Sequence, residues 1–257
     1  MGNPDQEIAE FLASCVNDPL KYVMGMFPWD TEPSIQIVEL PEAYRERFPN
    51  SKYGPDLWQC EFLDKLGEDI RSRRFNGRDP VEPVRKSTVS GHGVGKSTLA
   101  AWLVKFILDT RPYSVGTVTA NTSPQLYTKT WAEVGKWNAM SLTYHCYHYH
   151  NSKNNMVLRH REYSETWKCT AQTSDPKNSE SFAGQHTTTG TSFYIFDEAS
   201  NIDEIFYEVR EGGLISGEPM VFDFGNGTRN TGRFFENCKG KFADQTIVTG
   251  KQISSRV

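Results

Sequence analysis

The sequence predicts an α/β fold in which a mainly parallel sheet is flanked by helices and preceded by a helical N-terminal arm. Three observations lead to this class. Strand-like and helix-like segments alternate from residue 84 onward, a glycine-rich turn at 90–95 joins an apolar strand to a long helix, and an apolar run at 193–196 ends in two acidic residues. Such alternation favours βαβ units and a parallel sheet.

The N-terminal arm is predicted over residues 1–55. It begins with the helix-like segment "DQEIAEFLASCVNDPLKYVMGMF", followed by a proline-punctuated segment at 28–55. Apolar residues at helical spacing should pack one face of this segment on the main domain: Ile8, Phe11, Leu12, Cys15 and Val16. A second helix is predicted from residue 55 to about Arg74, where "NGRDPVEP" ends it. The main domain is assigned to 56–257.

Each element of the main domain is predicted from its own pattern. The expected strands are "VRKSTVS" (84–90), "SVGTVTAN" (114–121), "MVLRHR" (156–161), "TWKCTA" (166–171), "TSFYIFDEAS" (191–200) and "EPMVFDFGNGT" (218–228). The expected helices are "KSTLAAWLVKFILDT" (96–110) and "PQLYTKTWAEVGKWNAM" (124–140). Continuous apolar runs such as the one at 193–196 are typical of strands that are buried on both faces.

Composition places the chain among ordinary globular proteins. It has 257 residues, 37% hydrophobic and 23% charged, with a net charge of −4. The mild acidity argues against indiscriminate binding of nucleic acid over the whole surface. There is no apolar run of membrane-spanning length, and acidic residues near the start (Asp5, Glu7, Glu10) do not fit a signal peptide, so we expect a cytoplasmic protein without a membrane partner. Five scattered cysteines predict neither a disulfide framework nor a zinc site.

The turn "SGHGVGKST" at 90–98 has the arrangement of a phosphate-binding loop, the Walker A motif. A helix that begins at a lysine directs backbone N–H groups and its positive end toward phosphate oxygens. Lys96 would reach the β- and γ-phosphates of ATP, and Ser97 would offer a hydroxyl to Mg²⁺. Ser90 stands where the usual pattern has glycine, and a small side chain is tolerated there. The predicted nucleotide-binding residues of the loop are Ser90, Gly91, His92, Gly93, Val94, Gly95, Lys96, Ser97 and Thr98.

The second half of the predicted site is the acidic end of "FYIFDE", a Walker B pattern. In an open parallel sheet the carboxyl ends of the strands meet at the ligand-binding edge. Asp197 would hold Mg²⁺, and Glu198 would polarise the water that attacks the γ-phosphate, which makes Glu198 and Lys96 the predicted catalytic residues. The alternative is a strand that simply ends in solvated acids.

Three weaker patterns accompany these motifs. Gln59, in "DLWQ", has an amide that can donate to and accept from an adenine edge, or it is a surface glutamine beside a core tryptophan. "TANTSPQ" (119–125) resembles the motif after the second strand of helicase-like motors, or it is a plain helix cap. Asn226, Gly227 and Thr228 should follow a strand beside "FYIFDE" and report the state of the γ-phosphate, or Asn226-Gly227 forms a type I′ turn.

Together these stretches resemble a family, the ATPase domain of the large terminase subunit of tailed bacteriophages. The resemblance rests on "NDPLKYVMGMFPW", "GPDLWQCEFL", "SGHGVGKSTLAAW", "TVTANTSPQLYTKTWAEVGKW", "FAGQHTTTGTSFYIFDEAS" and "FGNGTRNTGRFFENC". It implies a RecA-like P-loop ATPase that drives double-stranded DNA into a procapsid as a homo-oligomeric ring, with a portal protein and a small terminase subunit as partners. It also implies that Gln59 reads adenine and that Asn226 to Thr228 form the coupling motif.

The sequence departs from the family pattern in two places. Many members carry an arginine within the phosphate loop, where this chain has His92. Arg229, Arg233 or an arginine of a neighbouring subunit would then supply the positive charge. Family members also continue into a nuclease domain, whereas this sequence ends at Val257. We therefore expect no DNA cleavage by this chain alone.

Several other readings stay open at this point. A helicase-like ATPase, a P-loop phosphotransferase acting on a small molecule and a nucleotide-gated binding protein are the alternatives. Lys129 and Lys136 are candidates to face DNA. The run Arg71, Arg73, Arg74 and Arg78 is interpreted as a solvated helix end, and His148 and His150 as ordinary surface or packing residues, because two histidines fall short of a tetrahedral metal site.

Overall fold

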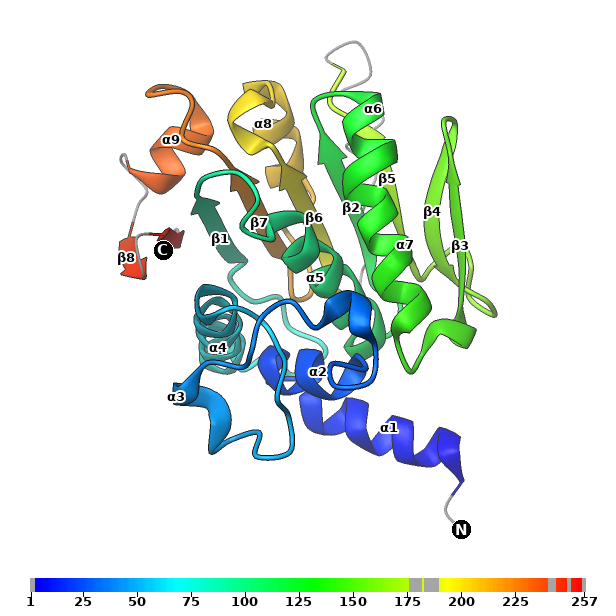
Figure 1. Cartoon of the computed structure of the whole chain (residues 1–257). Coiled ribbons are helices and arrows are strands. Elements are labelled where there is room, and N and C mark those ends of the chain that lie inside the picture. Colours follow the sequence, from blue (N-terminus) through cyan, green and yellow to red (C-terminus); the bar gives the residue numbers. More distant parts are fainter. Residues whose placement is uncertain (1–2, 176–181, 183–189, 240–243, 249–250, 256–257) are drawn as a thin grey trace.

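The computed structural model contains one nine-stranded sheet with the strand order β3-β4-β5-β2-β6-β7-β1-β9-β8. It describes residues 3–175, 182, 190–239, 244–248 and 251–255. The central strands β5, β2, β6, β7 and β1 run parallel to one another. Antiparallel strands extend both edges, β4 and β3 on one side and β9 and β8 on the other (Figure 1). The predicted fold class, a mainly parallel sheet flanked by helices, is confirmed.

Six of the nine strands, β1, β2 and β4 to β7, fall where the sequence predicts them, and β3, β8 and β9 complete the sheet. Their bounds are β1 Val84–Val89, β2 Val115–Ala120, β3 Tyr147–Ser152, β4 Asn155–His160, β5 Lys168–Thr173, β6 Ser192–Asp197, β7 Met220–Gly225, β8 Asp244–Val248 and β9 Lys251–Ser255. Successive side chains of a strand point to opposite faces. On β6, Phe193 and Ile195 accordingly join one hydrophobic core cluster, while Tyr194 and Phe196 join another. The sheet is therefore buried on both faces.

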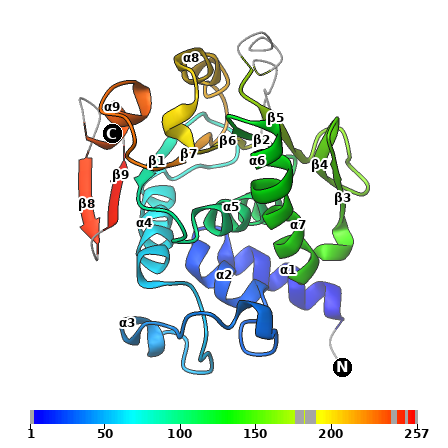
Figure 2. The same cartoon turned by 45° about the horizontal axis from the view of Figure 1, so that its top comes forward.

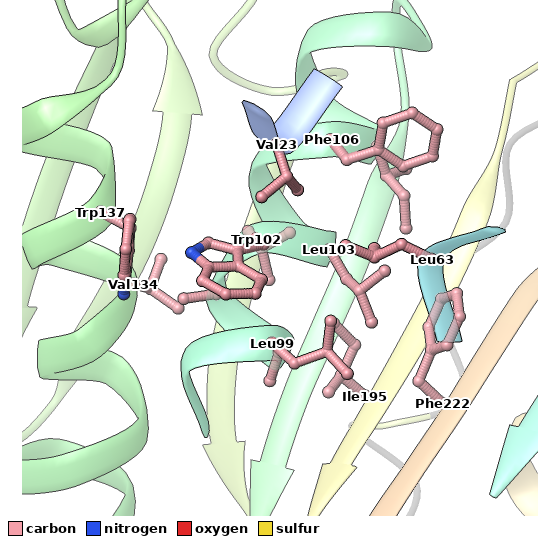
Figure 3. Packing of buried hydrophobic residues seen from close by; sticks show 14 of the residues in the cluster. Val23, Leu63, Leu99, Trp102, Leu103, Phe106, Val134, Trp137, Ile195 and Phe222 are labelled. Carbon is pink, nitrogen blue, oxygen red and sulfur yellow. The ribbon is translucent and has the colours of Figure 1, made fainter. Parts of the chain in front are cut away.

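Helices cover these two faces unequally. The larger core lies under α4 (Leu57–Arg73), α5 (Lys96–Thr110) and α7 (Trp131–Met140), and the smaller under α8 (Glu204–Gly212) and α9 (Arg233–Cys238). Figure 2 shows the two groups on opposite sides of the sheet. Figure 3 shows Leu99 and Leu103 of α5 on the side of Ile195 and Phe222 of the sheet, and Phe106 of α5 on the side of Val23 of the arm. Because α5 is apolar on nearly all sides, its position below the phosphate loop is fixed by packing.

The N-terminal arm packs on the outer side of α5 and α4 (Figure 1). Its elements are α1 (Pro4–Cys15), α2 (Pro19–Met26), the short 3₁₀ turn η1 (Pro33–Ile35) and α3 (Glu42–Arg45). The predicted single helical stretch is broken before Pro19, and the Asp18 carboxylate accepts from the Lys21 backbone N–H at 2.9 Å to begin α2. Arg47 donates to Asp18 and to Asp64 of α4, each at 2.6 Å.

Arm residues share the main hydrophobic core. Cys15 of α1 and Leu20, Tyr22 and Val23 of α2 belong to the same cluster as α5 and the sheet, and Phe11 and Leu12 pack against it. The expected packing face of the arm is thus confirmed for Phe11, Leu12 and Cys15, while the boundary at residue 55 stays a prediction.

One further helical segment differs from its predicted form, and several elements were not predicted. The helix predicted at 124–140 consists of α6 (Ser123–Gln125), one π-helical turn η2 (Leu126–Thr130) and α7. The short turns η3 (Tyr144–Cys146) and η5 (Ala199–Asn201), the helices α8 and α9 and the hairpin of β8 and β9 were not predicted. Residues 183–189, within one of the stretches that carry the family resemblance, lie outside the described residues.

Candidate functional site

Three parallel strands bring the predicted motifs to one edge of the sheet. β7 lies between β1, which leads into the phosphate loop, and β6, which ends at Asp197. Asn226 follows β7 directly, so the strand order inserts it between the loop and the acidic pair. A type I′ turn needs a positive φ at both central residues, and neither Asn226 nor Gly227 has one, so the alternative of a type I′ turn there is wrong.

Glycine conformations shape the phosphate loop. Gly93 and Gly95 have φ angles of +71° and +84°, which L-residues with a side chain rarely adopt. Gly95 caps α5, and a Cβ there would come within 2.7 Å of the Gln59 amide nitrogen. The Ser90 backbone N–H donates to the Gly225 carbonyl at 3.1 Å and holds the start of the loop on β7. The loop thus presents the first turn of α5, and its unpaired N–H groups, at the sheet edge.

Lys96 is the first residue of α5 and is only 8% exposed. Its Nζ donates to the Gly91 carbonyl at 2.7 Å, to Asn226 Oδ1 at 2.8 Å and to Ser90 Oγ at 3.3 Å. Burial lowers the pKa of Lys96, and the nearby Glu198 and Asp197 carboxylates act in the opposite direction. The ammonium group is thus held between the loop, the β7 end and the two acids.

Asp197 is buried and accepts three hydrogen bonds. Its Oδ2 accepts from Ser97 Oγ at 3.1 Å and from Thr130 Oγ1 at 2.6 Å, and its Oδ1 accepts from the Glu198 backbone N–H at 3.0 Å. A serine hydroxyl beside a carboxylate is a set of hard oxygen donors that suits Mg²⁺. The chemistry of these two side chains therefore fits the predicted metal, and the alternative of solvated acids is wrong for Asp197.

Glu198 and Asn226 are joined directly. Asn226 Nδ2 donates to Glu198 Oε2 at 3.1 Å and lies 3.2 Å from His92 Nδ1. One amide thus touches the lysine through its oxygen and the glutamate through its nitrogen. Glu198 has a φ of +52°, a conformation that non-glycine residues adopt mainly under local constraint. Thr228 donates to Ser200 Oγ at 3.2 Å, just past the acidic pair.

Gln59 is placed beside the loop, but both ends of its amide are engaged. Its Oε1 accepts from the Asp56 backbone N–H at 2.9 Å, which completes a capping box at the start of α4. Its Nε2 donates to the Gly95 carbonyl at 3.1 Å. With 5% exposure it is not a surface residue. The side chain fastens α4 to the phosphate loop, and its assignment as adenine reader stays a prediction.

Thr130 is a site residue that the sequence analysis missed. The Thr130 side chain is fully buried in the π-helical turn η2, and its hydroxyl donates to Asp197. Single π-helical turns occur often at functional sites, but the letters around Thr130 carry no motif that would have identified it. Of the earlier "TANTSPQ" stretch, Thr119 donates to the Gln172 carbonyl, and Thr122 makes no side-chain cap to α6.

The basic candidates differ in their surroundings. Arg233 Nη2 lies 3.9 Å from Glu211, while Arg229 is exposed on the loop after Thr228. Lys129 and Lys136 are exposed on η2 and α7, and Lys136 lies 4.0 Å from Glu133. Arg71 and Arg73 donate to backbone carbonyls of Asn17, Glu82 and Pro83. The contacts of Arg71 and Arg73 therefore hold the end of α4 against neighbouring backbone segments.

The remaining candidates were a histidine metal site and a membrane-spanning helix. Among the described residues, no group of three His, Cys, Asp or Glu side chains stands close enough to hold a metal, and His148 and His150 simply lie on β3. Within the same part of the chain, every helix is too short or too polar to cross a bilayer.

Comparison with known proteins gives likenesses in structure only. No family model and no curated protein matches the chain. The large terminase of a thermophilic bacteriophage is 15% identical, with 52% of this chain and 32% of that one covered and a TM-score of 0.40. The Thermus phage P74-26 large terminase ATPase domain is 16% identical, with coverages of 75% and 72% and a TM-score of 0.40. The large terminase of bacteriophage HK97 is 16% identical, with coverages of 71% and 36% and a TM-score of 0.43.

These are proteins of the kind that the sequence resemblance predicts. The match spans about a third of the length of the first and third of them. Because every identity is below 25% and every TM-score below 0.5, we draw no functional conclusion from these likenesses. The roles of individual residues rest on the geometry of the site.

Proposed function

We propose that this chain is the ATP-hydrolysing motor domain of a viral DNA-packaging terminase, which couples ATP hydrolysis to translocation of double-stranded DNA into a procapsid. The observation that carries the proposal is the connected set Lys96, Asn226 and Glu198, with Asp197 and Ser97 beside it, at one edge of a parallel sheet. Within one hydrogen-bonded network, this set provides a lysine that can bind phosphate, two oxygen-bearing side chains that can hold a metal and a carboxylate that can act as a base.

In this proposal the loop and Lys96 hold the triphosphate. Backbone N–H groups of the loop and the first turn of α5 face the phosphate oxygens, and the Lys96 ammonium exchanges the Gly91 and Asn226 oxygens for those of the phosphates. Ser97 and Asp197 would hold Mg²⁺, which when bound neutralises charge on the β- and γ-phosphates. Thr130 keeps the Asp197 carboxylate in position through its hydroxyl.

Glu198 acts as the general base for hydrolysis. A bond forms between the water oxygen and the γ-phosphorus, the bond from phosphorus to the bridging oxygen of ADP breaks, and the water proton passes to the Glu198 carboxylate. Asn226 Nδ2 donates to Glu198 Oε2 in the structure and fixes the orientation of that carboxylate. Because the same amide accepts from Lys96, a change in phosphate occupancy at Lys96 is passed to the base.

The motor function needs partners that lie beyond this site. The exposed Lys129 lies next to Thr130 on η2, and the exposed Lys136 lies on the following helix α7, so a duplex against these two elements would be linked mechanically to Asp197. A homo-oligomeric ring on a portal protein, with a small terminase subunit, completes the proposal, and an arginine from a neighbouring copy or Arg229 supplies charge at the γ-phosphate. Such a motor works in the host cytoplasm.

The proposal is tested by comparing Glu198→Gln with Glu208→Gln, a matched change at an exposed glutamate on α8. We expect the first variant to bind ATP normally and to lose turnover by about 100-fold or more, the usual scale for a lost general base. The second should match the wild type. Equal turnover in Glu198→Gln and the wild type would overturn the assignment of the base.

A second measurement separates the motor from its alternatives. Displacement of a triplex-forming third strand from duplex DNA, dependent on ATP, reports translocation without strand separation. Separation of the duplex itself would favour a helicase-like ATPase. Hydrolysis in ¹⁸O-labelled water should place one labelled oxygen in the released phosphate. Transfer of the γ-phosphate to a small molecule, without such labelled phosphate, would favour a phosphotransferase.

A further inference from the structure

A hollow of about 300 Å³ lies at the end of the sheet opposite to the phosphate loop. Its lining includes Thr191 and Glu218, which precede β6 and β7, and the segment 110–112, which precedes β2. The Lys96 site lies at the carboxyl ends of β6 and β7, and each of these strands has six residues, so about 20 Å of sheet separates the two places. The hollow is therefore no part of the proposed ATP site.

Three arginines line this hollow. The end of α4 supplies Arg71 and Arg74, which are exposed and belong to the basic run at 71–78. Arg111 is buried in the wall, where it donates to Glu218 Oε2 at 3.0 Å and to the Val16 carbonyl at 2.7 Å. The hollow thus joins the end of α4, the end of the arm helix α1 and the turn before β2.

The charges of this lining do not balance. Among its described residues Glu218 is the one carboxylate, and Arg111 already pairs with it. Arg71 donates to the uncharged Asn17 carbonyl at 2.8 Å, so neither Arg71 nor Arg74 has a carboxylate to pair with in this lining. A guanidinium group binds a carboxylate through two parallel hydrogen bonds. An acidic side chain of a bound molecule would therefore meet two cations that the described lining does not neutralise.

Apolar and aromatic side chains extend the same surface. The hollow is lined on its apolar side by Val16, Ile70, Phe75 and Pro112. The turn at 111–114 then leads to Tyr113, whose ring lies 5.2 Å from that of Tyr163, and the two are 46% and 43% exposed. Tyr113 has a φ of +61°, which bulky residues rarely adopt, so the turn holds this ring in solvent under strain. Arginine and tyrosine are among the side chains that contribute most to protein–protein binding.

The acidic residues nearby favour a peptide over a nucleic acid. Glu162 and Glu165 flank Tyr163 in the chain, and both are exposed. A nucleic-acid backbone laid from the arginines to the tyrosines would bring its phosphates toward these carboxylates. A peptide can place a carboxylate at the arginines alone and an uncharged side chain at the tyrosines.

We infer that the surface from Arg71 and Arg74 to Tyr113 docks an acidic peptide segment of a partner protein. A glutamate or aspartate carboxylate of the peptide lies between Arg71 and Arg74, and a neighbouring aromatic side chain packs on Tyr113. The inference goes beyond the proposed function and does not depend on the ATP site. It assigns a role to two arginines that the sequence alone leaves as a solvated helix end.

The test uses arrays of defined short peptides in which glutamate pairs stand at every spacing from a phenylalanine, with glutamine versions of the same peptides as the matched set. The full chain should bind members of the acidic array and not their glutamine versions. The best acidic peptide, labelled with fluorescein, then gives dissociation constants. Arg71→Gln combined with Arg74→Gln should weaken its binding about tenfold or more, the scale of a lost hot spot. Arg45→Gln combined with Arg78→Gln, the same charge change at exposed arginines outside the described lining, should stay within about twofold of the wild type.

Tyr113→Asn tests the aromatic part, and folding is not at risk because asparagine tolerates a positive φ. Peptide affinity should fall about fivefold, and the loss should vanish when serine replaces the phenylalanine of the peptide. If no acidic peptide binds more tightly than its glutamine version, or if both arginine pairs lower the affinity equally, the inference is overturned. Binding of a single-stranded oligonucleotide in place of the peptides, lost in Arg71→Gln combined with Arg74→Gln, would also overturn it. Thermal unfolding checks that each variant is folded.

Discussion

Helix α5 carries two lysine–carboxylate clusters of similar chemistry, one at the sheet edge with partners on an exposed loop and one buried beneath the arm. Lys96, at its first residue, donates to an amide oxygen, a serine hydroxyl and a backbone carbonyl, and it lies near two carboxylates at the sheet edge. Lys105, further along, donates to Asp109 Oδ1 at 3.2 Å and Thr143 Oγ1 at 3.0 Å, beneath the arm. We assign a functional role to the first cluster and a structural role to the second.

The Lys105 cluster is closed. Asp109 Oδ2 accepts from Tyr22 of the arm at 2.5 Å and from Thr143 at 2.8 Å, and the Lys105 ammonium lies 4.0 Å from the centre of the Tyr147 ring. Lys105 is fully buried, and burial lowers its pKa against the opposing effect of Asp109. Every one of these partners is a buried side chain, so none can be exchanged without opening the core.

The Lys96 cluster is open to exchange. Two acceptors of Lys96, the Gly91 carbonyl and Ser90 Oγ, belong to a loop, and Gly91 and His92 are exposed. Phosphate oxygens can replace these acceptors while the helix stays packed. The comparison teaches that the accessibility of the partners, more than the residue types, separates a binding lysine from a structural one.

The largest expected effect is on stability, at the closed cluster. Asp109→Ala leaves Lys105 buried without its counter-ion and should lower the free energy of unfolding by about 3–5 kcal/mol in denaturant titrations. ATP affinity of the folded protein should not change.

A matched double variant sharpens this prediction. Lys105→Met with Asp109→Leu removes both charges and should recover much of the lost stability, because no unpaired buried charge remains. If Asp109→Ala alone proved as stable as the wild type, the Lys105 cluster would contribute little to holding the arm in place.

The next effect concerns the open cluster through Thr130. Thr130→Val removes the hydroxyl that orients Asp197, and the Mg²⁺ concentration for half-maximal nucleotide binding should rise about tenfold. Thr130→Ser should restore it. Thr128→Val serves as control, because Thr128 is exposed and its hydroxyl donates only to the Pro124 carbonyl. An unchanged Mg²⁺ requirement in Thr130→Val would contradict the positioning role.

The smallest effect is a shift in pH dependence. Lys96 binds phosphate as the cation, so affinity is lost as pH rises through its pKa, and burial places that pKa below the ordinary value of 10.5. Glu198 raises the pKa of Lys96, so Glu198→Gln should move the loss of affinity to lower pH. Affinities measured between about pH 7 and 10 in both proteins and in Glu208→Gln check the direction. A shift to higher pH would contradict it.

The sequence predicts what depends on local pattern and misses what depends on distant contact. Apolar runs located the strands from β1 to β7, apart from the less regular β3, and the glycine spacing located the loop before Lys96. The hydroxyl of Thr130 meets Asp197 from a position 67 residues away, and no local signal marks such a pair. The Lys105 network likewise needs Tyr22 of the arm, 87 residues before Asp109.

Gln59 is a case in which a local pattern predicted a role but the packing engages the side chain elsewhere. Its position before the phosphate loop suggested a base reader, but the Asp56 cap and the Gly95 carbonyl occupy its amide. Motif order along the chain therefore predicted which segments meet, and packing decided which side chain of a segment is available.

The most direct test sets the two lysines against each other by calorimetric titration with a non-hydrolysable ATP analogue and Mg²⁺, together with thermal unfolding. Lys96→Met should abolish detectable binding and leave the unfolding temperature close to that of the wild type. Lys105→Met should bind the analogue with wild-type affinity and unfold at a clearly lower temperature. Full binding by Lys96→Met would contradict the account, and so would loss of binding in a folded Lys105→Met protein.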